Sequence, residues 1–396
     1  MTKLVFDFET TTHNKGNPFD TRNFAVGYSY YRPEVKPEHG PKWHGRYEDI
    51  DFKLKLKNAI TDATLLIGCN IKFDLHWVAN LGIQLPVGVR IWDLQLAQFI
   101  LSGQTHSFAS LNELAELYGF PTKLDAVADY WEKGVSTEDI PHEVLQEYND
   151  YDVELTWKVY EAQQKDPRMT PELHKLILLC GLDLLVLQDM EYNGLKYDIK
   201  ASEEAAEKLS LELLDIDKRL DCYSNGINYN SGDQLSCFLF GGMFEQEIRT
   251  PETRVYKSGP RKGLEYTADR IERRSVMLPG YFKPDPKTEL KKTKEDPKAT
   301  TRLYSTAADV LLQLKAKTKV QKDIVELLKR RAYIEKLVGT YLQALPALIE
   351  ERHWGEYLHG QYNQVVARTG RLSSSQPNLQ NQPSEVDQFI VSRYDS

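Results

Sequence analysis

The first part of the chain alternates strand-like and helix-like segments, and this alternation restricts the fold more than any other feature. Residues 4–9 alternate with a period of two, and a second strand pattern covers residues 25–31. The apolar run at 64–68 predicts a buried strand, and residues 71–80 then predict a helix. Further helical patterns cover residues 94–101, 111–118 and 141–164. Alternating strands and helices predict an α/β domain that ends near residue 168.

The second half predicts a different architecture, because helical patterns dominate it. The dipeptides Asp166-Pro167 and Thr170-Pro171 break the chain first. Amphipathic patterns then cover residues 172–192, 200–222, 306–316 and 321–342. Residues 251–301 are rich in Lys, Arg and Pro and poor in apolar side chains, which predicts an extended or partly ordered insertion. Short strand-like pieces and polar loops follow in residues 355–382.

Composition excludes several classes of protein. The net charge of −8 argues against a chain that is coated with nucleic acid, although a local basic groove is compatible with it. The four cysteines form no CxxC pair, so we expect no zinc site. Four scattered cysteines in a chain of this length indicate a protein of the reducing cytosol. The N-terminus lacks the pattern of a signal peptide, and no stretch of 18 apolar residues occurs. We therefore expect a cytoplasmic protein without a membrane span.

Two carboxylates share one face of the first predicted strand. Asp7 and Glu9 are two residues apart, so both side chains project from the same surface. Their mutual repulsion in an apolar context favours a bound cation, and Mg²⁺ or Mn²⁺ prefers such oxygen ligands. Taken alone, the pair also fits an ordinary solvated strand face.

Two further segments carry candidate site residues. Asn70 suits a turn or helix cap after the buried strand, and Asp74 falls in the first turns of the helix. Tyr148 and Asp152 are four residues apart, so they share a face if residues 141–164 are helical. Each segment has a plainer interpretation as well. Asp74 fits a helix dipole, Tyr148 a core aromatic residue, and Asp152 a surface charge.

Together, the order, spacing and contexts of these segments resemble the three motifs of the DEDD exonuclease superfamily, in the subclass with a Tyr-x-x-x-Asp third motif. The proofreading domain of family A DNA polymerases belongs to this subclass. The resemblance covers about residues 1–165. It implies a ribonuclease H-like domain with a mixed sheet and flanking helices, and it implies two-metal 3′→5′ hydrolysis of DNA that releases nucleoside 5′-monophosphates.

The resemblance also implies a role for each matched residue. The counterparts of Asp7, Glu9 and Asp152 hold the metal ion that activates water, and that of Asp7 bridges to a second ion. The counterpart of Asp74 reaches the second ion through water. Two Mg²⁺ or Mn²⁺ ions are thus the expected cofactors. Tyr148 is expected to orient the attacking water, since a phenol with a pKa near 10 is a poor base at neutral pH. Three neighbouring carboxylates are not expected to take part in catalysis: Asp93, Asp150 and Glu154.

A second resemblance lies in the later part of the chain. Residues 190–194 and 230–235 resemble the start of the polymerase domain of family A. Residues 368–374, continuing at 377–381, closely resemble the family signature near the primer terminus. Arg371 suits minor-groove acceptors, which correct base pairs present alike. The residues expected to contact DNA are Asn70, Phe73, Arg368, Arg371, Asn378, Gln380 and Asn381.

These resemblances predict three parts: a 3′–5′ exonuclease domain over residues 1–168, a mainly helical thumb over 169–354, and the start of a palm over 355–396. A basic insertion at about 245–305 interrupts the thumb. Two interpretations of it stay open: contact with DNA or a processivity factor, and a solvated disordered loop without a partner. The palm aspartates and fingers of the family have no counterpart in the 396 residues. We therefore expect either a fragment or one subunit of a split, phage-type polymerase, with a second polypeptide that carries palm and fingers. The alternatives are a stand-alone exonuclease and a non-enzymatic DNA-binding accessory subunit.

Overall fold

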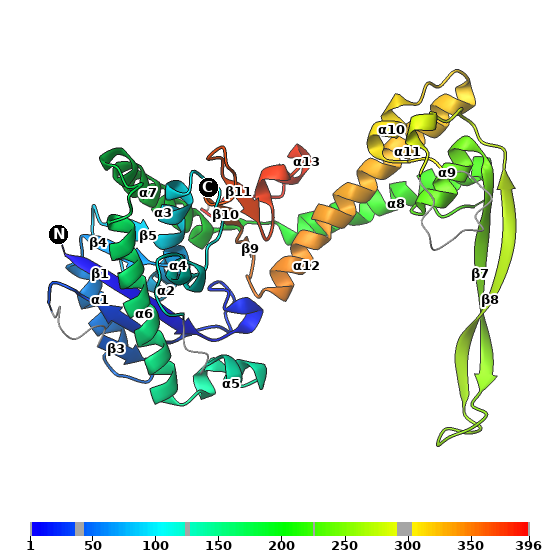
Figure 1. Ribbon diagram of the computed structural model, residues 1–396. Helices are drawn as coiled ribbons and strands as arrows, with labels where there is room; N and C mark the ends of the chain where they lie inside the picture. Colours follow the sequence, from blue (N-terminus) through cyan, green and yellow to red (C-terminus); the bar gives the residue numbers. More distant parts are fainter. Residues whose placement is uncertain (1, 36–42, 123–126, 225, 291–302, 395–396) are drawn as a thin grey trace. The chain divides into compact units, whose positions relative to one another are not determined.

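The computed structural model describes residues 2–35, 43–122, 127–224, 226–290 and 303–394, and the chain divides into two compact units (Figure 1). Unit 1 comprises Met1–Glu203 and Tyr341–Ser396, and unit 2 comprises Glu204–Thr340. These limits differ from the three expected parts, because unit 1 extends beyond residue 168 and takes in the C-terminal residues. No helix in the described part of the chain combines the length and apolar character needed to cross a bilayer.

Unit 1 is built on a five-stranded mixed sheet. The strands are β1 (Lys3–Thr10), β2 (Ala25–Tyr31), β3 (Trp43–Arg46), β4 (Leu65–Gly68) and β5 (Arg90–Asp93). Their order is β3-β2-β1-β4-β5, which places β1 at the centre. β1 pairs antiparallel with β2 and parallel with β4. The predicted α/β class with a mixed sheet is therefore confirmed.

Helices cover both faces of this sheet. Leu4, Phe6 and Phe8 of β1 pack in one core with residues of α1 (Phe52–Thr61), α2 (Ile71–Asn80) and α3 (Leu94–Leu101). Val5 points to the other face and packs in a second core with Val153, Leu155 and Val159 of α6 (His142–Gln164). Period-two alternation in β1 thus divides its side chains between two apolar cores. The short helices α4 (Leu111–Leu117) and α5 (Ala128–Glu132) lie between α3 and α6 in sequence.

The helix α7 (Pro171–Asn193) also belongs to unit 1. Its Gly181 lies so close to the sheet that an added Cβ would stand 2.5 Å from the Ile91 carbonyl oxygen of β5. Glycine therefore permits this contact, as it does where two backbones approach closely. Leu184 of α7 is buried in the first core.

The C-terminal residues complete unit 1. The π-helical turn η4 (Val338–Leu342) spans the limit between the two units in sequence. The C-terminal residues then form α12 (Ala344–Glu351), β9 (Tyr357–Leu358), β10 (Gln361–Asn363), β11 (Ser373–Ser375), η5 (Leu379–Asn381) and α13 (Ser384–Asp387). β9 pairs with β6 (Leu195–Lys196), and β10 pairs with β11. Val365 enters the first core, so this segment packs on the helices and sheet of unit 1 itself.

Unit 2 is helical apart from one long ribbon. Most of α8 (Ile199–Ser224) belongs to it, with α9 (Gly232–Phe240), the short turn η3 (Pro286–Thr288), α10 (Ala308–Gln313) and α11 (Lys319–Leu337). β7 (Gly242–Val255) and β8 (Glu265–Leu278) pair antiparallel without a register break. The sequence predicts an extended or partly ordered insertion over 251–301, and the structure forms a regular ribbon through residue 278. Residues 291–302 lie outside the described part.

Candidate active site

The end of β1 presents two carboxylates on the face that α6 covers. Asp7 and Glu9 follow Val5 at intervals of two residues, and Glu9 is buried. The register between β1 and β2 shifts between Glu9 and Thr10. Such a shift interrupts the regular pairing beside the two side chains and bends the strand locally.

α6 brings a third carboxylate and an amide to the same place. Carboxylate oxygens of Asp7, Glu9 and Asp152 all lie within 4.8 Å of one another. Asn149 precedes Asp152 by three residues, so the two share a helix face. The Asn149 Nδ2 donates to Asp7 Oδ2 at 2.8 Å and lies 3.4 Å from Glu9 Oε1.

Asp74 reaches β1 from α2. It lies in the first turn of that helix, and its Oδ1 accepts a hydrogen bond of 3.0 Å from the backbone N–H of Phe8, between Asp7 and Glu9. Burial raises the pKa of Asp74 well above its ordinary value, and the nearby charge of Asp7 raises it further. The fourth predicted carboxylate is thus buried beside the other three.

The N-terminus of α2 is fixed by a residue from another strand. Asn70 occupies the N-cap position in a left-handed conformation, with φ of 58°, and its side chain makes no capping bond. Asp93 supplies the cap instead: its Oδ2 accepts from Ile71 N at 2.7 Å, while its Oδ1 accepts from Leu96 N in α3. One buried carboxylate therefore sets the start of both helices.

The oxygen-rich cluster has the chemistry of a divalent-metal site. Asp7, Glu9 and Asp152 offer hard anionic ligands at short mutual separation, which Mg²⁺ and Mn²⁺ prefer. Their proximity is electrostatically unfavourable without a cation. The Asn149 amide is a neutral hydrogen-bond donor to one of these carboxylates, that of Asp7.

The other candidates on α6 have different surroundings. Tyr148 is half-buried one turn before Asp152, and its ring packs edge-on against Trp131 at 6.0 Å. Asp150 accepts a hydrogen bond of 2.6 Å from Ser29 Oγ, and Glu154 pairs with Lys158 on the same helix. Asp150 and Glu154 thus have structural partners within the fold.

A pocket in unit 1 combines the second motif with the C-terminal segment. Its volume is about 220 Å³, and Asn70 and Phe73 line one side while Gln361, Asn363 and Gln376 line another. Aromatic rings and carboxamides are suited to nucleobases and sugars.

The remaining signature residues are all exposed around β10, β11 and η5: Arg368, Arg371, Asn378, Gln380 and Asn381. The Asn378 side chain caps η5 by accepting from Gln380 N at 3.1 Å. The Asn381 carbonyl accepts from the Tyr341 hydroxyl.

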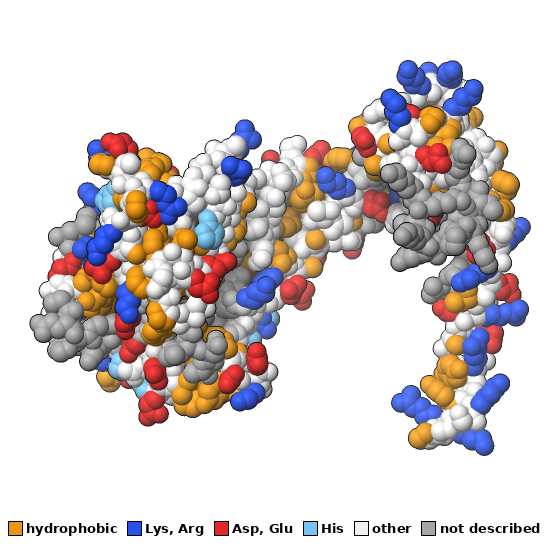
Figure 2. All heavy atoms as spheres, in the orientation of Figure 1, with side chains coloured by type: hydrophobic (Ala, Val, Ile, Leu, Met, Phe, Trp, Pro, Cys, Tyr) orange, Lys and Arg blue, Asp and Glu red, His pale blue; other side chains and the backbone are white. Residues whose placement is uncertain are grey.

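Unit 2 has its own cationic features. The loop of the β7–β8 ribbon exposes Lys257, Arg261 and Lys262 and has no acidic residue, which Figure 2 shows as blue side chains at the ribbon end. Two cations of α11, by contrast, are held in ion pairs: Arg330 with Glu212, and the buried Arg331 with Asp217.

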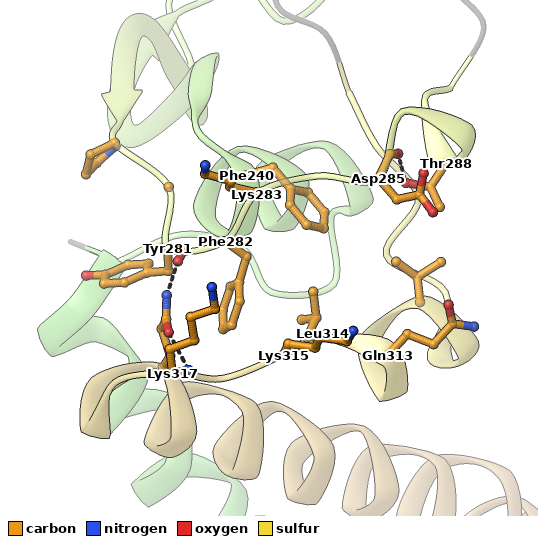
Figure 3. A pocket seen from close by; sticks show the side chains of 14 residues that line it. Phe240, Tyr281, Phe282, Lys283, Asp285, Thr288, Gln313, Leu314, Lys315 and Lys317 are labelled. Atoms are coloured by element: carbon orange, nitrogen blue, oxygen red, sulfur yellow. Dashed lines mark hydrogen bonds between the residues drawn. The ribbon is translucent and has the colours of Figure 1, made fainter.

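A cavity of about 900 Å³ also lies in unit 2 (Figure 3). Its lining combines rings of Phe240, Tyr281 and Phe282 with the lysines 283, 315 and 317. Gln321 Nε2 donates to the Tyr281 carbonyl, and Gln321 Oε1 accepts from Lys317 N, so this residue ties two sides of the cavity together.

Asn149 is the site residue that the sequence reasoning missed. A signal for it existed, because an amide at position i−3 from Asp152 must share that residue's face in a helix. A second missed feature is a buried ionic network around Glu191, which joins residues more than a hundred positions apart in sequence.

Two family models match separate parts of the chain. One, described as 3'-5' exonuclease, matches residues 47–166, which include Asp74, Tyr148 and Asp152. The other, described as DNA polymerase family A, matches residues 286–393, which include the signature at 368–381. Asp7 and Glu9 precede the first match, and the folded chain brings them to Asp152.

Relatives among curated proteins agree with these matches. The chain is 29% identical to DNA polymerase I of Chloroflexus aurantiacus over 325 residues, covering 81% of this chain and 29% of that protein. It is 24% identical to DNA polymerase I of Pseudomonas aeruginosa over 392 residues, covering 96% of this chain and 36% of that protein. The chain thus spans about a third of the length of these relatives.

A solved structure shows the same fold. It is the polymerase domain of Pol1 from M. smegmatis in complex with DNA primer-template and dNTP, with a TM-score of 0.63 and 18% identity. The match covers 98% of this chain and 54% of that one. The chain is therefore similar to family A DNA polymerases in two parts: residues 47–166 match a 3′–5′ exonuclease, and residues 286–393 match part of the polymerase region.

Proposed function

We propose that this chain is a two-metal 3′→5′ exodeoxyribonuclease that proofreads for a family A DNA polymerase. One observation carries the proposal: carboxylate oxygens of Asp7, Glu9 and Asp152 converge within 4.8 Å although they come from two distant elements. The buried Asp74 joins them through the Phe8 amide. An ordinary solvated strand face does not gather four carboxylates and bury three of them, Glu9, Asp74 and Asp152.

The carboxylates would hold two Mg²⁺ or Mn²⁺ ions, with Asp7, Glu9 and Asp152 on one and Asp7 with Asp74 toward the other. Such ions, when bound, lower the pKa of water and neutralise charge on the phosphate. Asn149 holds the Asp7 carboxylate in position through its 2.8 Å hydrogen bond. Tyr148 orients the attacking water, and its packing on Trp131 fixes the ring. The product is a nucleoside 5′-monophosphate.

The substrate is the 3′ end of a DNA strand. The pocket lined by Asn70 and Phe73 suits unpaired bases, which stack on aromatic rings. The exposed Arg368, Arg371, Asn378, Gln380 and Asn381 would contact primer-template duplex.

The test uses a single-stranded oligonucleotide labelled at its 5′ end, with Mg²⁺ or with EDTA. Labelled products that shorten one nucleotide at a time, only with the metal, support a 3′→5′ exonuclease. Immediate release of the labelled terminal nucleotide would show the opposite polarity and overturn the assignment.

For DNA synthesis, we propose that a second polypeptide supplies palm and fingers. The polymerase-family match over residues 286–393, beside the exonuclease match, supports a role in synthesis. Primer extension by residues 1–396 alone should stay at background and appear on mixing with a palm–fingers chain. Extension without such a chain would contradict this. If the chain hydrolyses DNA but no polymerase fragment restores DNA synthesis on mixing, the stand-alone exonuclease is favoured. If the chain binds DNA without hydrolysing it, the accessory subunit is favoured.

We further propose that the thumb insertion contacts DNA or a processivity factor. Its ribbon ends in Lys257, Arg261 and Lys262, and clustered exposed cations attract phosphate. Changing all three to Gln should weaken duplex binding at low salt or reduce processivity in the assembled enzyme. If neither the duplex affinity at low salt nor the processivity changes, the ribbon is a solvated element without a partner.

A further inference from the structure

Unit 1 contains a buried ionic network that the proposed chemistry does not use. Its centre is Glu191 near the end of α7, whose side chain is 2% exposed. Burial alone would raise the pKa of Glu191, but the hydrogen bond from His76 and the charge of Lys72 bring it below its ordinary value. A buried carboxylate of this kind requires its partners, because an unpaired buried charge is strongly unfavourable.

The partners of Glu191 come from two separate elements. Lys72 Nζ and His76 Nε2, both on α2, bond to Glu191 Oε1 and Oε2 at 2.5 and 3.0 Å. The backbone N–H of Tyr362 on β10 donates to Glu191 Oε1 at 2.6 Å. Lys72 Nζ also donates to the Tyr362 carbonyl, so the same cation contacts both the carboxylate and β10.

Aromatic and backbone contacts extend this network. The backbone carbonyl of Glu191 bonds to His359 Nδ1 at 2.8 Å. The His359 ring stacks on Phe19 with centroids 4.1 Å apart, and Phe19 in turn meets His76 edge-on. The network therefore ties α2, α7 and the C-terminal segment into one contact set.

The network holds one face of α2, and β1 holds the opposite face. Lys72 and His76 are four residues apart and share one helix face, whereas Asp74 between them points to the opposite side. Asp74 is held on β1 by the Phe8 amide, and the other face is held by Glu191. Lys72, His76 and Glu191 also line the pocket of about 220 Å³ whose walls include Phe73 and Asn363.

We propose that Glu191 is a positioning residue of the exonuclease, which fixes the spacing between the α2 wall and the β10 wall of the pocket that receives the DNA 3′ end. This inference rests on the proposed function. It assigns no chemical step to Glu191. Loss of the carboxylate would leave Lys72 without its buried counter-ion and free the Tyr362 amide, so the two walls would separate. Asp74 keeps its own hydrogen bond to Phe8, and the carboxylate cluster is held from β1 and α6.

The experiment compares the wild type with Glu191→Gln and Glu191→Ala. The expected result is a rise in the KM for a single-stranded oligonucleotide, about threefold for Gln and about tenfold for Ala, with kcat within about twofold, since misplaced binding groups weaken substrate positioning. Dissociation constants for the same oligonucleotide, measured by fluorescence anisotropy in EDTA, should rise in the same order.

Asp166→Asn is the matched control for Glu191→Gln. Asp166 is also a buried carboxylate of unit 1, bonded to Arg168 and Tyr118, but it does not line the pocket. It should lower the melting temperature without changing KM or Kd. If Glu191→Ala does not fold, Glu191→Gln against this control decides the outcome.

An unchanged KM and Kd in folded Glu191 variants, or an equal rise in Asp166→Asn, would overturn the positioning role. Failure of the proposed function would be seen separately. The wild type would then show no Mg²⁺-dependent hydrolysis, whereas the anisotropy measurement would still report on the pocket.

Discussion

The Asn149 Nδ2 atom lies 2.8 Å from Asp7 Oδ2 and connects α6 to the central strand inside the carboxylate cluster. An amide at this position satisfies one Asp7 oxygen without adding charge. It also limits the directions in which the remaining oxygens can point. Substituting a group that orients a metal-binding side chain in this way typically lowers metal affinity or activity by about 10- to 100-fold.

We predict that Asn149→Ala lowers exonuclease activity by about 10- to 100-fold and raises the Mg²⁺ concentration needed for half-maximal activity. Asn149→Asp should be worse, because it adds a carboxylate to three others. The measurement is a Mg²⁺ titration of the initial rate on single-stranded DNA. Equal rates and an equal Mg²⁺ requirement for Asn149→Ala would remove Asn149 from the site.

Asp74→Asn should separate stability from activity. Burial and the charge of Asp7 both disfavour the ionised form of Asp74, so its charge costs folding free energy at neutral pH when no metal is added. An asparagine keeps an oxygen for the Phe8 amide and removes the charge. We expect the free energy of unfolding in EDTA to rise by about 1 to 3 kcal/mol.

The same variant should lose exonuclease activity in Mg²⁺. Urea unfolding in EDTA and the nuclease assay check the two effects independently. A variant that is less stable than the wild type in EDTA would show that the Asp74 carboxylate is stabilised by contacts stronger than its burial and the repulsion from Asp7.

Much of the N-terminal fold was predictable, because its pattern follows simple periodicities. The alternation at residues 4–9 fixes which side chains of β1 enter each core, and α2 begins and ends at the predicted residues 71 and 80. The sequence did not predict β5, which is only four residues long and runs directly into α3. Its register depends on pairing with β4, which local sequence does not encode.

The ribbon in unit 2 shows a different limit. β7 contains Pro251 and many charged residues, so its composition resembles a disordered segment. Pairing with β8 over fourteen residues stabilises it through backbone hydrogen bonds, while most side chains of β8 are exposed. The network around Glu191 was equally hidden, since Lys72 and Glu191 are 119 positions apart and each looks like a surface charge in sequence.

Acid should weaken unit 1 through Asp20. Hydrogen bonds from Arg22 lower the pKa of this buried carboxylate to about 2, against the opposing effect of burial. Because the folded pKa lies below the unfolded one, the pair stabilises the fold above about pH 4, and this contribution is lost as the pH falls toward 2.

We therefore predict that Asp20→Asn lowers the free energy of unfolding by about 1 kcal/mol near pH 6 and has little effect near pH 2, with the half-exposed Arg22 limiting the size of the effect. Urea unfolding of both proteins across this range provides the measurement. A difference that is constant with pH would show that the carboxylate charge is not its source.

The most direct test of the central claim is the release of deoxynucleoside 5′-monophosphates from single-stranded DNA by the wild type and by the Asp7→Ala/Glu9→Ala variant. We expect Mg²⁺-dependent release by the wild type and none above background by the variant. The circular dichroism spectrum of the variant should match that of the wild type. Its melting temperature in EDTA should equal or exceed that of the wild type, because two repelling carboxylates are gone. Undiminished release by the folded double variant would contradict the assignment of the carboxylate cluster as the exonuclease site.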